Sequence, residues 1–270
     1  MATTSPIRVG VFGAGGPMGS TVGRAVMADP DLELVAAVDP HHSGIELSRV
    51  AELSGLGDDD LMVSGTPDSL LAARVDVAID FTQVDAARQN LLWLAGHGIH
   101  AVVGTTGFSD DDLVAFRSAF DQSNCLIAPN FAIGAILMMR FAALAAPYFD
   151  TAEIIEFHHD DKIDAPSGTA TLTAERMAEA SSEWGSDPTT ELVYDGARGG
   201  QGPAGIRVHS VRMRGMVAHQ EVILGATGQT LVIRHDSIDR TSFMPGVLLA
   251  SKAIADHPGV TVGLDDLLDL

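Results

Sequence analysis

The sequence is poor in the residues on which secreted, membrane and nucleic-acid-binding proteins depend. Its 270 residues include one cysteine, Cys125, which excludes an intramolecular disulfide and favours a reducing cytoplasm. No apolar run is long or pure enough to cross a bilayer, and we expect no secretory signal. Lysine and arginine total 16 against 36 acidic residues, so the net charge is −20. This charge argues against binding to nucleic acid or to an anionic membrane, since both need basic surfaces.

Strand-like and helix-like segments alternate through the first half of the chain. Apolar runs of strand length lie at residues 7–12, 32–38, 75–81, 99–104 and 125–128. Helical patterns separate them, among them a run that ends at Ala28 and runs at residues 86–97 and 111–121. Such alternation is typical of a parallel sheet that helices cover on both faces.

The pattern changes after Asn130. The sequence predicts a long apolar helix at residues 132–149, a strand that ends at Glu156 and a helix at residues 171–180. Three further runs alternate like antiparallel strands, with a turn at residues 226–229 and an exposed loop at residues 183–205. These three predicted strands are residues 206–215, 217–224 and 230–235. The helical run 242–257 is expected to return to the first domain.

A glycine-rich loop follows the first predicted strand. The strict G-x-G-x-x-G spacing fails because Met18 takes its last place, but a wider spacing of Gly13, Gly16 and Gly19 fits. Glycines here let the backbone approach a pyrophosphate, and Asp39, at the end of the next strand, can hold a ribose hydroxyl. Strand, loop, helix, strand and terminal acid together favour a dinucleotide site over a purely structural turn. Asp39 would repel a 2′-phosphate, which favours NADH.

We therefore expect an α/β protein with two domains. The first is a Rossmann-like, doubly wound parallel sheet formed by residues 1–130 and completed by residues 240–270. The second, residues 131–239, is an α+β domain with an open mixed sheet. The exposed edges of such a sheet are a liability that assembly into an oligomer would relieve. His41 and His42, after Asp39, are expected to be solvated loop residues, because neutral histidine is a poor phosphate anchor.

Proton donors, a cation and an anion cradle lie together in residues 156–170. His158 and His159 can exchange protons near neutral pH, and Lys162 supplies positive charge. Backbone N–H groups at Gly168 and Thr169, just before a helical run, can bind an anion. These features suggest a small acidic substrate. No metal site is expected, because four successive possible ligands at residues 158–161 rarely converge on one ion and no H-x-x-x-H pair is present.

Together these segments resemble dihydrodipicolinate reductase over essentially the whole chain. The pieces that carry the resemblance are residues 13–19, 80–82, 104–107, 128–131, 156–170 and 240–243. The resemblance implies NAD(P)H-dependent reduction of 4-hydroxy-tetrahydrodipicolinate, a ring with two carboxylates, to tetrahydrodipicolinate in diaminopimelate and lysine biosynthesis. It also implies a homotetramer that forms through the second domain.

The resemblance also implies residue roles. His158 matches the proposed proton donor and Lys162 the second catalytic residue, and His159, Gly168 and Thr169 match substrate-binding positions. The hydroxyl of Ser167 can take a substrate carboxylate at the same helix start. Asp39 matches the ribose-binding acid. The implied pyrophosphate-binding residues are Gly13, Ala14, Gly15, Gly16, Pro17 and Met18. The implied nicotinamide-side residues are Phe81, Gly104, Thr105, Thr106, Ala128, Pro129, Asn130 and Phe131. Many members have a basic residue in place of Pro17, and some have arginine in place of Pro40, so we expect use of both cofactors with a lean to NADH.

Two other functions remain open from the residues alone. A semialdehyde or diamino-acid dehydrogenase is one, and the semialdehyde version would need Cys125 as a reactive thiol, although its apolar strand favours a buried one. A non-catalytic dinucleotide sensor is the other. Met138 and Met139 are expected in the core, residues 110–112 at a helix start and residues 58–60 in a solvated loop.

Overall fold

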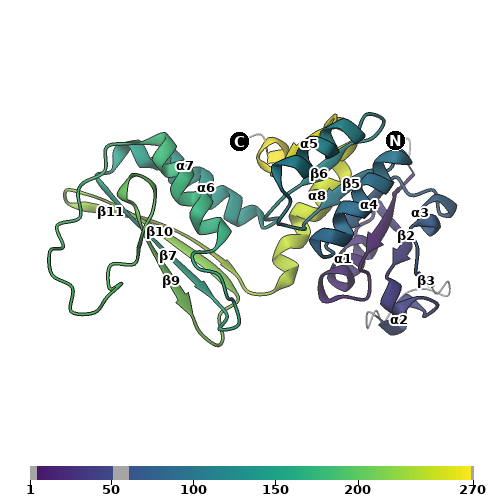
Figure 1. Ribbon diagram of the computed structural model, residues 1–270, viewed down its shortest axis with the longest axis horizontal. Helices are drawn as coiled ribbons and strands as arrows, with labels where there is room; N and C mark the ends of the chain where they lie inside the picture. Colours follow the sequence, from purple (N-terminus) through teal and green to yellow (C-terminus); the bar gives the residue numbers. More distant parts are fainter. Residues whose placement is uncertain (1–4, 51–60, 269–270) are drawn as a thin grey trace. The chain divides into compact units, whose positions relative to one another are not determined.

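The chain folds into two compact units, each with its own sheet. The computed structural model describes residues 5–50 and 61–268. Unit 1 comprises Met1–Phe131 and Phe243–Leu270, and unit 2 comprises Ala132–Ser242 (Figure 1). Unit 1 is therefore built from both ends of the chain, and unit 2 lies between them in the sequence. The expected solvated loop at residues 58–60 lies outside the described residues.

Unit 1 contains a seven-stranded sheet in which every pairing is parallel. In spatial order its strands are β12 (Val260–Val262), β6 (Cys125–Ile127), β5 (His100–Val103), β4 (Val77–Asp80), β1 (Ile7–Phe12), β2 (Leu32–Val38) and β3 (Val63–Ser64). The order reverses between β1 and β4. Ligands of such sheets bind at this reversal, outside the carboxyl ends of the strands.

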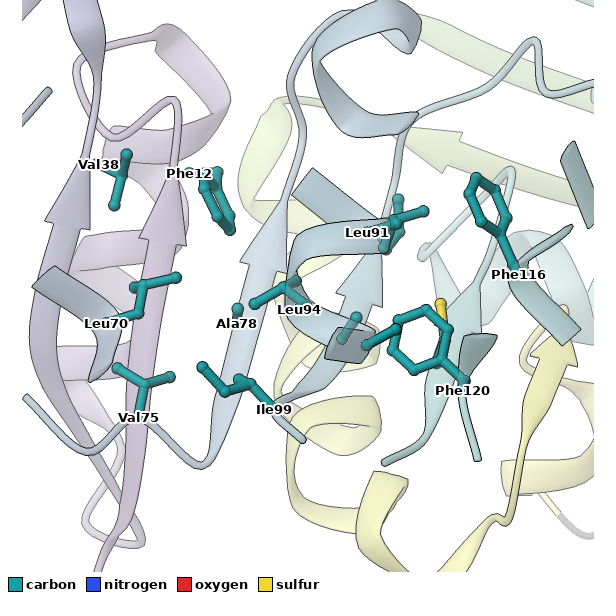
Figure 2. Close-up of a cluster of buried hydrophobic side chains, with 14 of the residues drawn as sticks. Phe12, Val38, Leu70, Val75, Ala78, Leu91, Leu94, Ile99, Phe116 and Phe120 are labelled. Carbon is teal, nitrogen blue, oxygen red and sulfur yellow. The ribbon is translucent and has the colours of Figure 1, made fainter. Parts of the chain in front are cut away.

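Helices cover both faces of this sheet. One face packs on α3 (Asp68–Ala72), α4 (Val84–Gly96) and α5 (Asp110–Ala119) through Leu91, Phe116 and their neighbours (Figure 2). The other face packs on α1 (Pro17–Ala28) and α8 (Met244–Ala253). A short helix, α2 (Leu47–Val50), follows β2. A capping box formed by Ser109 and Asp112 starts α5, so the acidic run at 110–112 begins a helix as expected.

Unit 2 contains a five-stranded mixed sheet. In spatial order its strands are β11 (Gln229–Ser237), β10 (Ala218–Ala226), β7 (Thr151–His158), β9 (Arg207–Arg212) and β8 (Gly200–Gln201). Its helices α6 (Ile133–Ala145) and α7 (Gly168–Ala180) pack together, and both contact the sheet. Their face of the sheet buries Ile154, Val222 and Leu224, while Val232 on the opposite face is 49% exposed.

The predicted fold class is confirmed, with local corrections. The expected antiparallel arrangement is wrong for β9, which pairs in parallel with β7 rather than with β10. Alternating polarity shows which face a side chain occupies but not which strand is the neighbour. The expected helix at 132–149 ends at Ala145 and continues as a 3₁₀ turn, Ala146–Tyr148, because Pro147 cannot donate to the helix. The short strands β3, β8 and β12 were not predicted, and β8 lies within the expected loop at residues 183–205.

Other sequence expectations are confirmed. Residues 226–229 form a two-residue hairpin turn in which Gly228 has φ 78°. Met138 and Met139 are buried. Helix α7 begins at Gly168, three residues before the predicted start, because Ser167 already caps it.

Candidate functional site

The glycine-rich loop of unit 1 is a tight turn that requires glycine at two positions. Gly13 has φ 65°, and its N–H donates to the carbonyl of Val38 at 2.7 Å. A Cβ at Gly19 would lie 2.1 Å from the carbonyl oxygen of Gly13, so no larger residue fits there. Helix α1 then starts at Pro17 without a side-chain cap. Uncapped N–H groups at a helix start are donors that a pyrophosphate can use.

Asp39 fixes this loop from the end of β2. Its side chain is buried, and it accepts a hydrogen bond from the N–H of Gly15 at 3.0 Å and another from the N–H of His41 at 3.0 Å. Nδ1 of His42 lies 3.1 Å from the Asp39 carboxylate. His41 is exposed as expected, but the expectation for His42 is wrong, because its ring packs between Asp39 and Gly15.

The residues assigned to the nicotinamide side follow the carboxyl ends of β4, β5 and β6. The rings of Phe81 and Phe131 lie 5.6 Å apart, and a Cβ at Gly104 would lie 1.9 Å from the ring of Phe81. The hydroxyl of Thr105 donates to the carbonyl of Thr82 at 2.8 Å. Ala128 is buried at the end of β6, whereas Thr106 and Pro129 are exposed and Asn130 is half-buried.

A buried acid that sequence reasoning did not single out holds this edge together. Asp80 accepts hydrogen bonds from the N–H of Thr82 at 2.7 Å, the hydroxyl of Thr82 at 2.6 Å and the amide of Asn90 at 2.7 Å. Its burial raises the pKa of the carboxyl group, against the opposing effect of these hydrogen bonds. Asp80 thereby fixes the backbone that follows β4.

The signature segment of unit 2 gathers around another buried acid, Glu156. Nδ1 of His158 makes a very short hydrogen bond to the Glu156 carboxylate. Arg212 donates to both oxygens of the same carboxylate at 2.8 Å. The N–H of Ser167 also donates to it at 3.2 Å. His158 and Ser167 are therefore connected through a single side chain that is fully buried.

The other predicted residues lie around this group. The hydroxyl of Ser167 caps α7 by accepting from the N–H of Ala170 at 3.2 Å. Gly168 is exposed at the start of α7, and a Cβ there would meet nothing within 4 Å. Thr169 is half-buried, and His159 is exposed beyond the end of β7. The ammonium of Lys162 donates to the carboxylate of Asp164 at 2.8 and 2.9 Å.

The thiol of Cys125 is unsuited to nucleophilic catalysis. It is fully buried in β6, and burial raises its pKa well above the ordinary range. The described part of the chain holds no group of three or more His, Cys, Asp or Glu side chains that could bind a metal ion. Within residues 5–50 and 61–268, no helix is long and apolar enough to cross a membrane.

Comparison with known proteins connects both sites to one family. The family described as dihydrodipicolinate reductase, N-terminus, matches residues 7–131, and the family described as dihydrodipicolinate reductase, C-terminus, matches residues 134–268. The chain belongs to the dihydrodipicolinate reductase family.

Full-length relatives agree with this assignment. A 4-hydroxy-tetrahydrodipicolinate reductase of Nocardia farcinica is 50% identical over 98% of this chain and 99% of its own. One of Corynebacterium aurimucosum is 48% identical over the same shares. The solved structure of a dipicolinate-bound dihydrodipicolinate reductase from Paenisporosarcina sp. TG-14 has a TM-score of 0.83 at 38% identity, covering 97% of this chain and 99% of its own.

The predicted groups of residues are divided between the two units. The residues assigned to the cofactor all lie in unit 1, and those assigned to catalysis and substrate binding all lie in unit 2. Sequence reasoning missed Glu156 and Arg212 as functional residues. Glu156 could have been found, because residues two apart on a strand share a face and His158 is two residues on. Arg212 could not have been found, because the sequence does not show which strand lies beside the strand that carries it.

Proposed function

We propose that this chain reduces 4-hydroxy-tetrahydrodipicolinate to tetrahydrodipicolinate, with NADH or NADPH, in diaminopimelate and lysine biosynthesis. The observation that carries the proposal is the 50% identity to a reductase of this name over nearly the full length of both chains. The two candidate sites, one at the glycine-rich loop of unit 1 and one around Glu156 in unit 2, supply the chemistry that this reaction needs. We assign dinucleotide binding to unit 1 and substrate binding to unit 2.

The start of α7 suits a substrate carboxylate. Gly168 and Thr169 begin a helix of 13 residues, and N–H groups at a helix start favour anions. The Paenisporosarcina relative binds dipicolinate, an aromatic ring with two carboxylates. We assign His159, exposed beside this segment, to the same ligand, because a protonated imidazole adds positive charge.

His158 and Lys162 supply the proton and the positive charge. Water must leave the ring of the substrate, which then has a conjugated C=C. A bound nicotinamide cofactor would supply a hydride to a ring carbon, and electron density then moves toward the ring nitrogen, where a proton is needed. The Nδ1 atom of His158 is engaged by Glu156, so Nε2 is the atom that delivers a proton. The ammonium of Lys162 is held by a carboxylate that is 58% exposed, so its charge can turn to the substrate at little cost.

We propose that both cofactors are used, with a lean to NADH. The pyrophosphate lies at residues Gly13 to Met18, and the carboxylate of Asp39 accepts hydrogen bonds from the adenosine ribose. A 2′-phosphate would meet that carboxylate, and neither Pro17 nor Pro40 provides a cation. Like-charge repulsion at a partly solvated site is worth about 1 kcal/mol, or about fivefold in preference.

We propose a homotetramer assembled through the open face of the unit 2 sheet. Ile155, Phe157 and Ile223 are half-buried on this face, and Val232 is 49% exposed. Association would remove this apolar surface from water. Light scattering on the purified protein tests the mass. Cytoplasmic location remains a prediction from the single cysteine.

A coupled assay tests the function. The upstream synthase generates the substrate in the cuvette, and the oxidation of NADH and NADPH is followed separately. We expect substrate-dependent oxidation of both cofactors and tetrahydrodipicolinate as the product. Absence of substrate-dependent oxidation while dinucleotide still binds would instead support the sensor. Loss of activity on thiol modification under native conditions would support a semialdehyde dehydrogenase, which the burial of Cys125 disfavours.

A further inference from the structure

Glu156 contacts two features that the proposed reaction needs and an arginine that balances its charge. Its side chain has no exposed surface, and it accepts from His158, from both terminal nitrogens of Arg212 and from the N–H of Ser167. Ser167 is the residue that caps α7. One carboxylate therefore connects the proton donor to the start of the helix assigned to the substrate.

The carboxylate stays ionised in spite of its burial. Burial alone raises the pKa of a carboxyl group, but hydrogen bonds from His158, Arg212 and Ser210 outweigh it and lower the pKa of Glu156 to about 2. Arg212 also donates to the carbonyl of Asp164 at 2.7 Å, which holds the guanidinium in place. A two-point contact of this kind is both strong and directional.

The residues opposite Glu156 on the two neighbouring strands do not take its place as the partner of His158. Gln220 lies opposite Glu156 on β10, but its amide donates to the hydroxyl of Thr173 on α7 at 2.7 Å. Ser210 lies opposite Glu156 on β9. Among the hydrogen bonds of Glu156, the one to His158 reaches an imidazole, whose proton can lie on either ring nitrogen.

We propose that Glu156 is a positioning residue that holds His158 with its Nδ1–H toward the carboxylate, leaving Nε2 to deliver the proton, and that Arg212 holds Glu156 in place. The inference rests on the proposed function. An ionised carboxylate beside imidazole fixes the tautomer and the ring orientation, as carboxylates do for histidines in other sites.

A second cluster on the same strand provides a matched control. Glu153, three residues earlier on β7, accepts from His209 at 2.5 Å and from Arg198 at 2.5 Å. It contains the same three residue types but points to the opposite face, away from His158 and Ser167. Glu153→Gln therefore breaks a similar Glu–His–Arg cluster without touching the candidate site.

The experiment compares Glu156→Gln, Glu156→Asp and Glu153→Gln in the full-length protein. We expect Glu156→Gln to lower kcat by about 10- to 100-fold with a much smaller change in KM. Glu156→Asp, which keeps the charge, should recover part of the loss. Glu153→Gln should keep kcat, and light scattering checks that its assembly is unchanged. A kcat of Glu156→Gln within about twofold of the wild type would overturn the proposal, as would an equal loss in Glu153→Gln.

Nitrogen NMR of the imidazoles gives a readout that does not depend on activity. Wild-type His158, assigned by comparison with His158→Gln, should carry its proton on Nδ1 when neutral, and Glu156→Gln should lose this preference. A wild-type His158 with its proton on Nε2 alone would overturn the proposal even if the variant failed to fold. An inactive wild type with the Nδ1–H signature would instead count against the proposed function.

Discussion

Each unit of the chain uses a buried carboxylate to fix the loop before a helix that is assigned to ligand binding. In unit 1, Asp39 receives the N–H of Gly15, two residues before α1. In unit 2, Glu156 receives the N–H of Ser167, the residue before α7. Asp39 directly follows β2, Glu156 lies on β7, and both acids are at most 5% exposed. The same local problem, an anion-binding helix start held against a sheet, has the same solution in two unrelated sheets.

The two acids differ in the group beside them. Glu156 faces a guanidinium with two contacts at 2.8 Å, a fixed charge at any ordinary pH. Asp39 faces His42 at 3.1 Å, which is charged only when protonated. An acid that is balanced by arginine is suited to hold its neighbours. An acid that keeps net negative charge is suited to bind a ligand hydroxyl and to repel a phosphate.

Removing the histidine that Glu156 holds should have the largest effect. His158→Gln should lower kcat by on the order of 10² to 10⁴-fold, with a smaller rise in KM, because it removes the general acid. His209→Gln, in the matched cluster on the other face of β7, should leave kcat unchanged. Steady-state kinetics of the two variants checks this, and a near-normal kcat for His158→Gln would remove it from the proton-donor role.

The difference in stability between the wild type and Glu156→Gln should depend on pH and become smaller in acid. The folded-state pKa of Glu156 is about 2 against an ordinary 4.5. The stabilisation from its ionised form is therefore complete above about pH 4.5 and is lost as the pH falls toward 2. A shift of this size is worth on the order of 3 kcal/mol.

Urea unfolding of both proteins between neutral and acid pH measures this contribution. The stability advantage of the wild type over Glu156→Gln should shrink steadily below about pH 4.5. A difference that does not depend on pH would mean that Glu156 titrates normally in the folded state.

Substitutions of Lys162 test whether a cation with an exposed partner acts on the substrate, whereas Arg212, with a buried partner, holds Glu156 in place. Its partner carboxylate, Asp164, is 58% exposed, so the ammonium is available to the substrate. Lys162→Met should lower kcat by about 10²-fold, as for loss of one group that stabilises developing charge. Lys162→Arg should lose less, because it keeps the charge while changing the donor geometry. Equal and mild losses would make Lys162 an ordinary loop residue.

The smallest expected effect concerns Asp39, the acid that lies beside a histidine rather than an arginine. Wild type should prefer NADH by only about fivefold. Asp39→Ser with Pro40→Arg removes one repulsion and adds one attraction, so kcat/KM should shift toward NADPH. An unchanged ratio in the double variant, or a strong NADPH preference in the wild type, would contradict the role of Asp39.

Local signals in the sequence predicted most of unit 1. β1 and β2 have the predicted bounds, because each is an apolar run with turn residues on both sides. The acid at Asp39 was predictable from its distance to the glycines, since strand and helix lengths set that distance. Strand β12 was missed because three residues are too few to show a period.

The part of the site that was missed depends on pairing between distant strands. Arg212 reaches Glu156 only because β9 lies beside β7 in parallel register, with Arg212 opposite His158. Neither polarity nor spacing encodes that register. Asp80 was missed for another reason: an acid at the end of a buried strand can be a ligand or a structural acceptor, and only its contacts with Thr82 and Asn90 decide.

The last strand of unit 1 has a consequence for synthesis of the chain. β12 pairs with β6, although Val262 follows Ile127 by 135 residues. At about 5–20 residues per second, the ribosome leaves the edge of β6 unpaired for roughly 7 to 27 seconds. During that interval unit 2 emerges in full, while the parallel sheet of unit 1 still presents open N–H and C=O groups to other nascent chains. This delay makes chaperone protection most valuable between completion of β6 and arrival of β12.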